Sequence, residues 1–244
     1  MGKPYEPPTS SVDLLGSVPS LIAHPETKTI TDHFIGKTFL CKLPGGQLYF
    51  ESALEVDTDG SVFSKQDPTG AKPDKTGVSP TSAPDADGKS LDADKINYFV
   101  LPKGGFDTRH KIGLGDVAVV IFGSRIAFAC YGDRGQPNKL GEGSIALHRA
   151  LGNETVAGGR LINAAKGGNG IDSGVITIVF PGTGHGIGRN NGDCAAIGRE
   201  QFQKLKSEAY QYDMELLSRY RTRQMSIPDD RDDLVAILSE WMQE

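Results

Sequence analysis

Short apolar runs, each closed by turn-forming residues, dominate the first three quarters of the chain. Runs of about four to eight apolar or alternating residues bounded by Gly, Pro, Asn or Asp are typical of β-strands. Such runs lie at 38–43, 48–56, 96–101, 116–122, 125–131 and 175–180. Glycine turns at Gly45 and Gly123 separate neighbouring runs and predict hairpins. Five or six strands with little regular helix predict a small β-barrel or sandwich.

The last quarter of the chain has a helical pattern instead. Apolar residues recur at near-helical spacing between Gly198 and Arg223, and again between Asp229 and Trp241. The acids that open the second segment favour a helix N-terminus. Both segments are interpreted as amphipathic helices that pack on the barrel, with a separate partner-binding module as the alternative. A shorter helix is predicted over Gly143 to Leu151, with Ser144 as a candidate N-cap.

These patterns divide the chain into three parts. Residues 1–35 are rich in Pro and Ser and predict an irregular arm, residues 36–190 form the barrel, and residues 191–244 form a helical extension. Within the barrel, residues 64–90 have almost no apolar side chains and predict a long loop. The 31 Gly and 14 Pro of the 244 residues agree with a fold rich in turns.

Charge and hydropathy narrow the classes of partner. The net charge is −5 and no block is rich in Lys and Arg, so nucleic-acid binding is not supported. No apolar run has the length that spans a bilayer, so no membrane partner is predicted. Met1 to Leu21 lacks a basic start followed by an apolar stretch, so no signal peptide is predicted. Secretion then requires a trimmed leader or another export route, and a cytoplasmic location is the alternative.

The cysteines and histidines do not form recognisable metal motifs. Cys41, Cys130 and Cys194 are far apart and contain no CxxC, which disfavours a zinc ribbon or redox motif. One disulfide plus a free thiol, or no disulfide, are both open. His110, His148 and His185 match neither HxxxH nor HExxH, so no metal site and no cofactor are expected.

Two carboxylates held between glycines are the strongest chemical feature. Asp133 and Glu142 lie nine residues apart, directly after the apolar run at 125–131. Hydrolysis of a glycosidic bond needs such a pair, an acid for the leaving oxygen and a base or nucleophile opposite it. Taken alone, the segment is also typical of a solvent-exposed turn.

With its flanks, this segment resembles glycoside hydrolase family 75, the fungal and bacterial endo-chitosanases, over about residues 39–184. The resemblance is carried by 118–120, 131–133, 141–147 and 151–152, by the acidic segment 54–60, and by 91–102 and 179–182. It implies a mainly β fold, a compact six-stranded barrel of double-psi-like type, to which the C-terminal helices are an extension. It also implies an inverting endo-hydrolase of β-1,4-linked glucosamine chains, whose substrate is chitosan or a related amino-sugar polymer.

The resemblance assigns the essential acids to Asp133 and Glu142, and we expect Glu142 to be the general acid and Asp133 the base. Asp57 and Asp59, which alone predict a β-turn before a glycine, are expected to line the cleft. Arg134 is expected either to hold its neighbour Asp133 ionised through its charge or to face solvent. Tyr131 completes the predicted substrate-binding set.

Two other functions remain open. The absence of a predicted leader and the extra helices are compatible with a peptidoglycan-cleaving glycosidase that acts as an antibacterial toxin. A non-catalytic carbohydrate-binding barrel is the alternative outside enzymes. The sequence predicts no oligomeric state.

Overall fold

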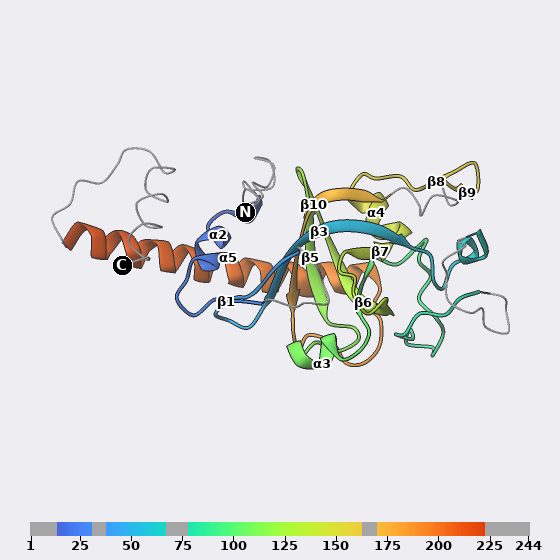
Figure 1. Ribbon diagram of the computed structural model, residues 1–244, viewed down its shortest axis with the longest axis horizontal. Helices are drawn as coiled ribbons and strands as arrows, with labels where there is room; N and C mark the ends of the chain where they lie inside the picture. Colours follow the sequence, from blue (N-terminus) through green and yellow to red (C-terminus); the bar gives the residue numbers. More distant parts are fainter. Residues whose placement is uncertain (1–13, 31–37, 67–77, 163–169, 223–244) are drawn as a thin grey trace.

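The computed structural model describes residues 14–30, 38–66, 78–162 and 170–222. Figure 1 shows a β-barrel with one long helix behind it, which continues past one end of the barrel. Among the described residues, no helix combines the length and the apolar character that a membrane crossing requires.

Six strands close into a barrel. In order around the wall they are β3 (Leu48–Asp57), β10 (Ile171–Phe180), β5 (Val117–Phe122), β6 (Arg125–Gly135), β4 (Tyr98–Pro102) and β7 (Glu142–Ser144). The sheet closes because β7 also pairs with β3. The pairs β4–β6 and β3–β7 are parallel, and the other four are antiparallel. The predicted six-stranded barrel with a C-terminal helix is confirmed.

The predicted strands are found, and the differences lie where the apolar pattern is weak. The strand predicted to end at Tyr131 continues to Gly135, and the three-residue strand β7 was not predicted. Within the arm expected to be irregular, the structure has a short helix, α2 (Val18–Ile22), and the strand β1 (Lys28–Thr29). β1 pairs with β2 (Phe39–Lys42), which extends the sheet outward from β3.

Short elements fill the connections. They are the 3₁₀ helix η1 (Val62–Gln66), α3 (Phe106–His110), α4 (Ile145–Ala150) and the two-stranded ribbon of β8 (Val156–Ala157) and β9 (Arg160–Leu161). The predicted helix after Glu142 is confirmed as α4. Its N-cap is Ser144, whose hydroxyl accepts the Leu147 N–H at 3.1 Å.

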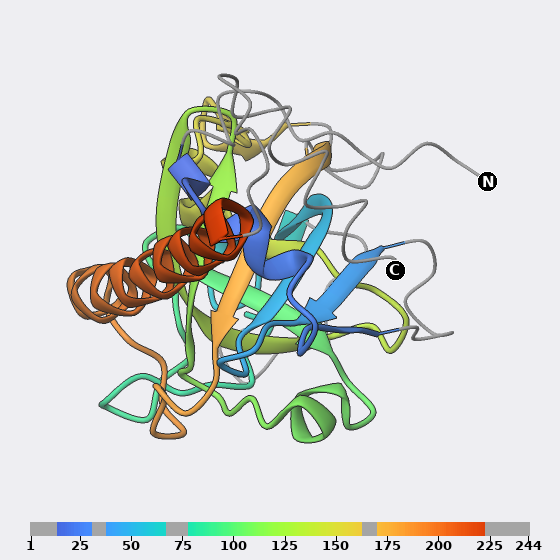
Figure 2. The ribbon, with the colours of Figure 1, turned by 90° about the vertical axis from the view of Figure 1, so that its left-hand side faces the viewer.

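The long helix α5 (Asn191–Thr222) begins earlier than its apolar pattern predicted. Its start is marked by Asn190, whose side-chain oxygen accepts the Asp193 N–H at 2.9 Å. Figure 2, seen from the end where α5 protrudes, shows α2 beside α5. The second predicted helix, 229–241, lies outside the described residues.

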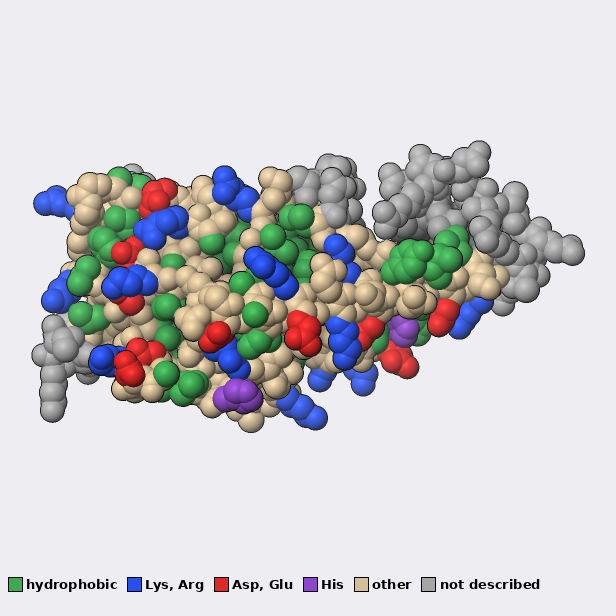
Figure 3. Space-filling view, turned by 180° about the vertical axis from the view of Figure 1, so that it is seen from behind, with side chains coloured by type: hydrophobic (Ala, Val, Ile, Leu, Met, Phe, Trp, Pro, Cys, Tyr) green, Lys and Arg blue, Asp and Glu red, His purple; other side chains and the backbone are tan. Residues whose placement is uncertain are grey.

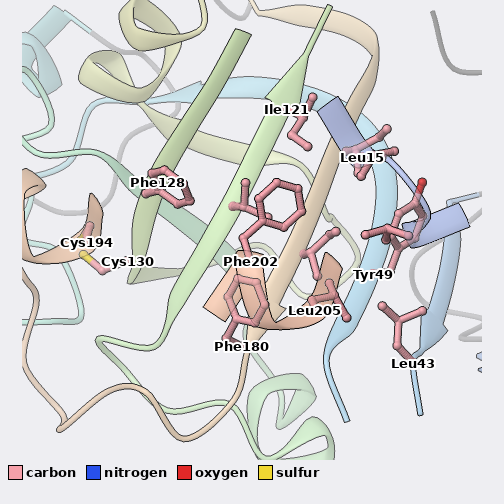
Figure 4. Packing of buried hydrophobic residues seen from close by; sticks show 14 of the residues in the cluster. Leu15, Leu43, Tyr49, Ile121, Phe128, Cys130, Phe180, Cys194, Phe202 and Leu205 are labelled. Atoms are coloured by element: carbon pink, nitrogen blue, oxygen red, sulfur yellow. The ribbon is translucent and has the colours of Figure 1, made fainter. Parts of the chain in front are cut away.

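Two apolar cores lie on the two sides of the barrel wall. One is the barrel interior, which contains buried residues from β3, β4, β5, β6 and β10, such as Phe50, Phe99 and Tyr131. The other lies outside the wall, where α2 and α5 pack on the strands. Figure 4 shows Phe202 and Leu205 of α5 pointing toward Ile121 and Phe180 in this outer core. We call this outer contact the helix seam.

The surface on the rear of the molecule has mixed charge. Figure 3 shows Lys and Arg side chains interspersed with Asp and Glu over this face. The described part of this face therefore has no continuous basic patch of the kind that follows a nucleic-acid backbone.

Candidate active site

Asp133 and Glu142 lie on two strands that flank the same third strand. Asp133 is on β6 and Glu142 is the first residue of β7. β4 runs between them, and its residue Val100 is the register partner of both acids. Register partners project their side chains to one face of a sheet, so both acids lie on the face of Val100. With strands about 4.8 Å apart, their Cα atoms are roughly 10 Å apart.

A β-bulge in β6 turns Asp133 out of the barrel. Phe99 pairs with Tyr131 and the next residue, Val100, pairs with Asp133, which leaves Gly132 as the extra residue. Without this bulge Tyr131 and Asp133 would share a face, because side chains alternate along a strand. Tyr131 lies in the barrel interior, whereas Val100 belongs to the outer core. The bulge therefore re-aims the carboxylate, a use that bulges often have beside active sites.

The glycines around the two acids make room for side chains of the site. A Cβ on Gly132 would lie 2.6 Å from the Tyr98 side chain. A Cβ on Gly135 would lie 2.7 Å from Glu142 Oε2 and 2.8 Å from Val100 Cγ1. Glycine is thus required at both positions by close packing within the protein.

Asp133 is held by three donors on one oxygen. Its Oδ1 accepts the Ser82 N–H at 2.8 Å, the Ser82 hydroxyl at 2.5 Å and the Arg134 N–H at 2.7 Å. The side chain is 7% exposed. Three donors on one oxygen fix the orientation of the carboxylate. Ser82 was not predicted, because no motif connects a serine in a polar loop with a strand 51 residues later.

Asp57 and Asp59 are brought to the same place. One carboxylate oxygen from each of Asp57, Asp59 and Asp133 lies within 4.8 Å of the others. The pKa of Asp57 is raised well above its ordinary value, first by burial and then by the charges of Asp133, Glu142 and Asp59. We call Asp57, Asp59, Asp133 and Glu142 the acidic site. Such a group of oxygens suits a bound cation or the ammonium group of an amino sugar.

Tyr98 connects the acidic site to the wall beneath it. Its side chain is fully buried, and its hydroxyl donates to the Asp59 carbonyl oxygen at 3.0 Å. The pKa of Tyr98 is raised, first by burial and then by the charges of Asp57, Asp133, Asp59 and Glu142. The tyrosine therefore stays a neutral donor among the four acids, a role that its apolar sequence context did not indicate.

A lysine stands next to Glu142. The Lys139 ammonium is 2.6 Å from Glu55 Oε2 and 3.9 Å from Glu142 Oε2. Glu55 and Glu142 are register partners on β3 and β7. The closer contact makes Glu55 the main partner of Lys139, and Glu142 keeps a side chain that is 19% exposed.

The comparison with protein families agrees with this geometry. The protein family described as "Fungal chitosanase of glycosyl hydrolase group 75" matches residues 54–214 of the chain. The chain belongs to this family. It is therefore a glycoside hydrolase, and family membership implies that it hydrolyses chitosan. None of the curated proteins shows significant similarity to the chain.

The family region of this hydrolase is not the barrel alone. It continues through most of α5, to residue 214, whereas the resemblance read from the sequence ended near residue 184. It therefore includes the part of α5 that forms the helix seam. Phe202 and Leu205 belong to the family region as fully as the acids do.

Two of the predicted substrate-binding residues lie elsewhere in the hydrolase. Tyr131 has no exposed surface, and its hydroxyl donates to Asp107 Oδ2 at 3.2 Å. The Arg134 guanidinium also binds Asp107, at 3.0 Å. Burial alone would raise the pKa of Asp107, but hydrogen bonds from Arg134 and Thr108 hold it below its ordinary value. The bulge at Gly132 is the physical reason, because it sends Asp133 to one side of the wall and these two side chains to the other.

His148, on the short helix α4, is a packing residue. It is fully buried, with Nε2 3.1 Å from the Glu55 carbonyl oxygen and Nδ1 3.0 Å from the Asn153 amide nitrogen. These partners suit the neutral ring with its proton on Nε2. Burial lowers the pKa of His148 to about 4, so the ring stays neutral near pH 7.

Proposed function

We propose that this hydrolase cleaves β-1,4 bonds within chitosan chains by a single-displacement, inverting mechanism. Asp133 acts as the base that takes a proton from the attacking water, and Glu142 as the acid that protonates the leaving glycosidic oxygen. The observation that carries the proposal is the placement of the two acids on either side of Val100. The backbones of the two acids are two strand spacings apart, and an inverting mechanism needs carboxyl groups about 6.5–9.5 Å apart, against about 5–5.5 Å for a retaining one, so that a water fits beside the sugar.

The surroundings of each acid suit its role. Three donors converge on one oxygen of Asp133, which fixes the carboxylate and leaves the second oxygen for water. The carboxyl group of Glu142 lies beside Gly135, next to the Lys139 ammonium, and its side chain is 19% exposed, so it can be reached by a bound sugar chain.

Asp57 and Asp59 are proposed to bind the substrate. A glucosamine unit carries an ammonium group near neutral pH, and the two side chains offer oxygens within 4.8 Å of one another and of Asp133. Binding a cation would relieve the repulsion that raises the pKa of Asp57. We also propose that the enzyme acts outside the cell, because its substrate is a polymer too large to cross a membrane.

Separate replacement of the two acids tests the catalytic assignment. Asp133→Asn and Glu142→Gln should each lower kcat on chitosan by about 10³-fold or more, since each removes one half of the acid–base pair. Asp172→Asn, which changes an exposed acid of β10, is the matched control and should keep full activity. Circular dichroism should show the same fold in all three variants. Hydrolysis that survives both replacements would show that these acids are not the catalysts.

Product stereochemistry and a substrate panel test the rest. NMR of the first products should show the α-anomer, because a single displacement inverts the β-linkage. A fast early release of the β-anomer would overturn inversion. Chitosan, chitin and purified bacterial cell-wall sacculi, assayed side by side, should show oligomer release from chitosan. Release from sacculi alone would establish a cell-wall glycosidase instead.

A further inference from the structure

Two buried cysteines meet where α5 begins. Cys130 is on β6, Cys194 is in the first turn of α5, and neither side chain is exposed. Their sulfur atoms lie 3.8 Å and 4.0 Å from the same acceptor, the Arg189 carbonyl oxygen. Figure 4 shows the two side chains pointing toward one another from the strand and the helix.

We propose that Cys130 and Cys194 form a disulfide that fastens α5 to the barrel when the chain folds in an oxidising environment. Both thiols are free in the structure, and their sulfurs lie within 4.0 Å of one shared acceptor, so the two side chains that a disulfide would join already face one another. The third cysteine is on β2, apart from this pair, and burial raises the pKa of Cys41 to about 12, which makes it unreactive. The fold thus selects one pairing among those that the sequence left open.

The chemistry balances with a small disulfide such as oxidised glutathione. One cysteine thiolate attacks glutathione disulfide and releases one glutathione thiolate, which leaves a mixed disulfide. The second cysteine thiolate attacks that mixed disulfide and releases the second glutathione. The two cysteines lose two electrons and two protons in total, and glutathione disulfide accepts the electrons.

Burial sets when this reaction occurs. Because both sulfurs are enclosed in the folded protein, the oxidant has access only before α5 has docked on β6. The link would close a loop between positions 130 and 194, which lowers the conformational entropy of the unfolded chain and so stabilises the folded state. We expect the midpoint of thermal unfolding to rise by about 5–15 °C.

Peptide mapping tests the link directly. The full chain is refolded with a mixture of oxidised and reduced glutathione, alkylated, and digested with trypsin without reduction. Cleavage after Lys and Arg places Cys130 in peptide 126–134, Cys194 in 190–199 and Cys41 in 38–42. Mass spectrometry should find 126–134 joined to 190–199, with 38–42 alkylated. Alkylation of all three peptides, or a link that involves 38–42, would overturn the proposal.

Thermal unfolding with and without reductant gives the second readout. Reduction should lower the midpoint of the wild type by about 5–15 °C and leave that of Cys194→Ser unchanged. Cys41→Ser is the matched control and should keep the full dependence on reductant. If the unfolding midpoint of the wild type is the same with and without reductant, the proposal is wrong. If a variant fails to fold, the peptide map of the wild type still decides.

A second inference, which rests on the proposed function, concerns Ser82. Its N–H and hydroxyl both donate to Asp133 Oδ1, and its hydroxyl oxygen accepts the Arg134 N–H at 3.2 Å. The next residue, Ala83, donates its N–H to the Gly132 carbonyl oxygen at 2.8 Å. The loop is therefore fastened to the bulge on both sides of the carboxylate.

We infer that Ser82 is the positioning residue of the catalytic base. By occupying Oδ1 it fixes the plane of the carboxylate and directs Oδ2 toward the water. Loss of such positioning reduces the rate of the chemical step, whereas the substrate contacts are unchanged.

Kinetics of serine variants test this role. Ser82→Ala should lower kcat about tenfold with KM within a factor of about two, and Ser82→Thr, which keeps the hydroxyl, should recover most of the rate. Ser90→Ala, which removes another hydroxyl from the same loop, is the control, since Ser90 binds the Thr81 N–H and not Asp133. Wild-type rates for Ser82→Ala, alongside an inactive Asp133→Asn, would overturn this inference alone. An active Asp133→Asn would instead overturn the proposed function.

Discussion

The acidic site and the helix seam lie on the same barrel wall and affect its stability in opposite ways. The acidic site places Asp57, Asp59 and Asp133 close together with about 7% of each side chain exposed, which costs folding free energy. The helix seam buries Phe202 and Leu205 against the strands, and this burial of apolar surface stabilises the fold. The difference shows that the wall is stabilised at a place separate from the acidic site, where we propose that the substrate is bound and cut.

The strand β6 explains how the acidic site and the helix seam can exist on one wall. β6 carries Cys130 toward α5 and, after the bulge, Asp133 toward the acidic site. One strand therefore serves both regions, and the bulge at Gly132 marks the change between them. Changes on the two sides of this point should separate stability from activity.

The largest effect on stability is expected from Phe202→Ala. The side chain is 4% exposed in the helix seam, so its truncation should lower the free energy of unfolding by about 3–5 kcal/mol, measured by denaturant titration. The rate on chitosan, measured well below the unfolding midpoint, should stay near that of the wild type.

The same helix offers a control for this change. Tyr210 is 55% exposed, so Tyr210→Ala should change stability by no more than about 0.5 kcal/mol. A Phe202→Ala variant that unfolds like the wild type would show that α5 does not hold the barrel. A specific loss of rate in a folded variant would show that the two regions are coupled.

A smaller effect should depend on pH through His148. Its folded pKa of about 4 lies below the ordinary 6.5, so the unfolded chain binds a proton first as the pH falls. The stability that the neutral, buried ring contributes is fully present above pH 6.5. It is lost between pH 6.5 and about 4, by roughly 3 kcal/mol. His148→Gln should lack this part of the loss of stability at acid pH, whereas His185→Gln, at an exposed position, should retain it. Parallel pH curves for all three proteins would contradict the assignment.

An effect of opposite sign should come from Asp57→Asn. Because the folded pKa of Asp57 is raised, the unfolded chain loses its proton first as the pH rises above 3.8, and stability falls. An amide cannot ionise, so the variant should gain stability over the wild type as the pH rises, and match it most closely below pH 3.8. Thermal melts across this range measure the difference. A variant that is less stable at neutral pH would show that the charge is compensated.

The sequence predicted the strands and helices with a strong local pattern better than those that depend on contacts with other elements. Alternating and apolar runs located the strands, and Ser144 was identified as a helix cap, because such preferences are set within a few residues. The C-terminal end of β6 and the existence of β7 were missed, because both segments are rich in Gly and polar residues and are held by pairing with β4. The arm before residue 36 contains α2, which is stabilised by packing on α5, and β1, which is stabilised by pairing with β2.

The candidate site was also predicted only in part. Asp57, Asp59, Asp133 and Glu142 do meet, as the family resemblance implied. Tyr131 and Arg134, adjacent in sequence to the acids, face Asp107 on the other side of the wall. Ser82 and Tyr98 carried no motif, yet both contact the acidic site. Nearness in sequence was misleading because one extra residue in a strand reverses the face of the residues after it.

The sequence by itself determined the kinds of element, the family and the pair of acids, because these depend on local patterns and on short motifs. The tertiary structure alone decided which side chains share a face. It placed Asp133 and Glu142 across Val100, set Ser82 against Asp133 and brought Cys130 to Cys194. These outcomes depend on strand register and on helix docking, which join residues distant in the chain and leave no local trace in it.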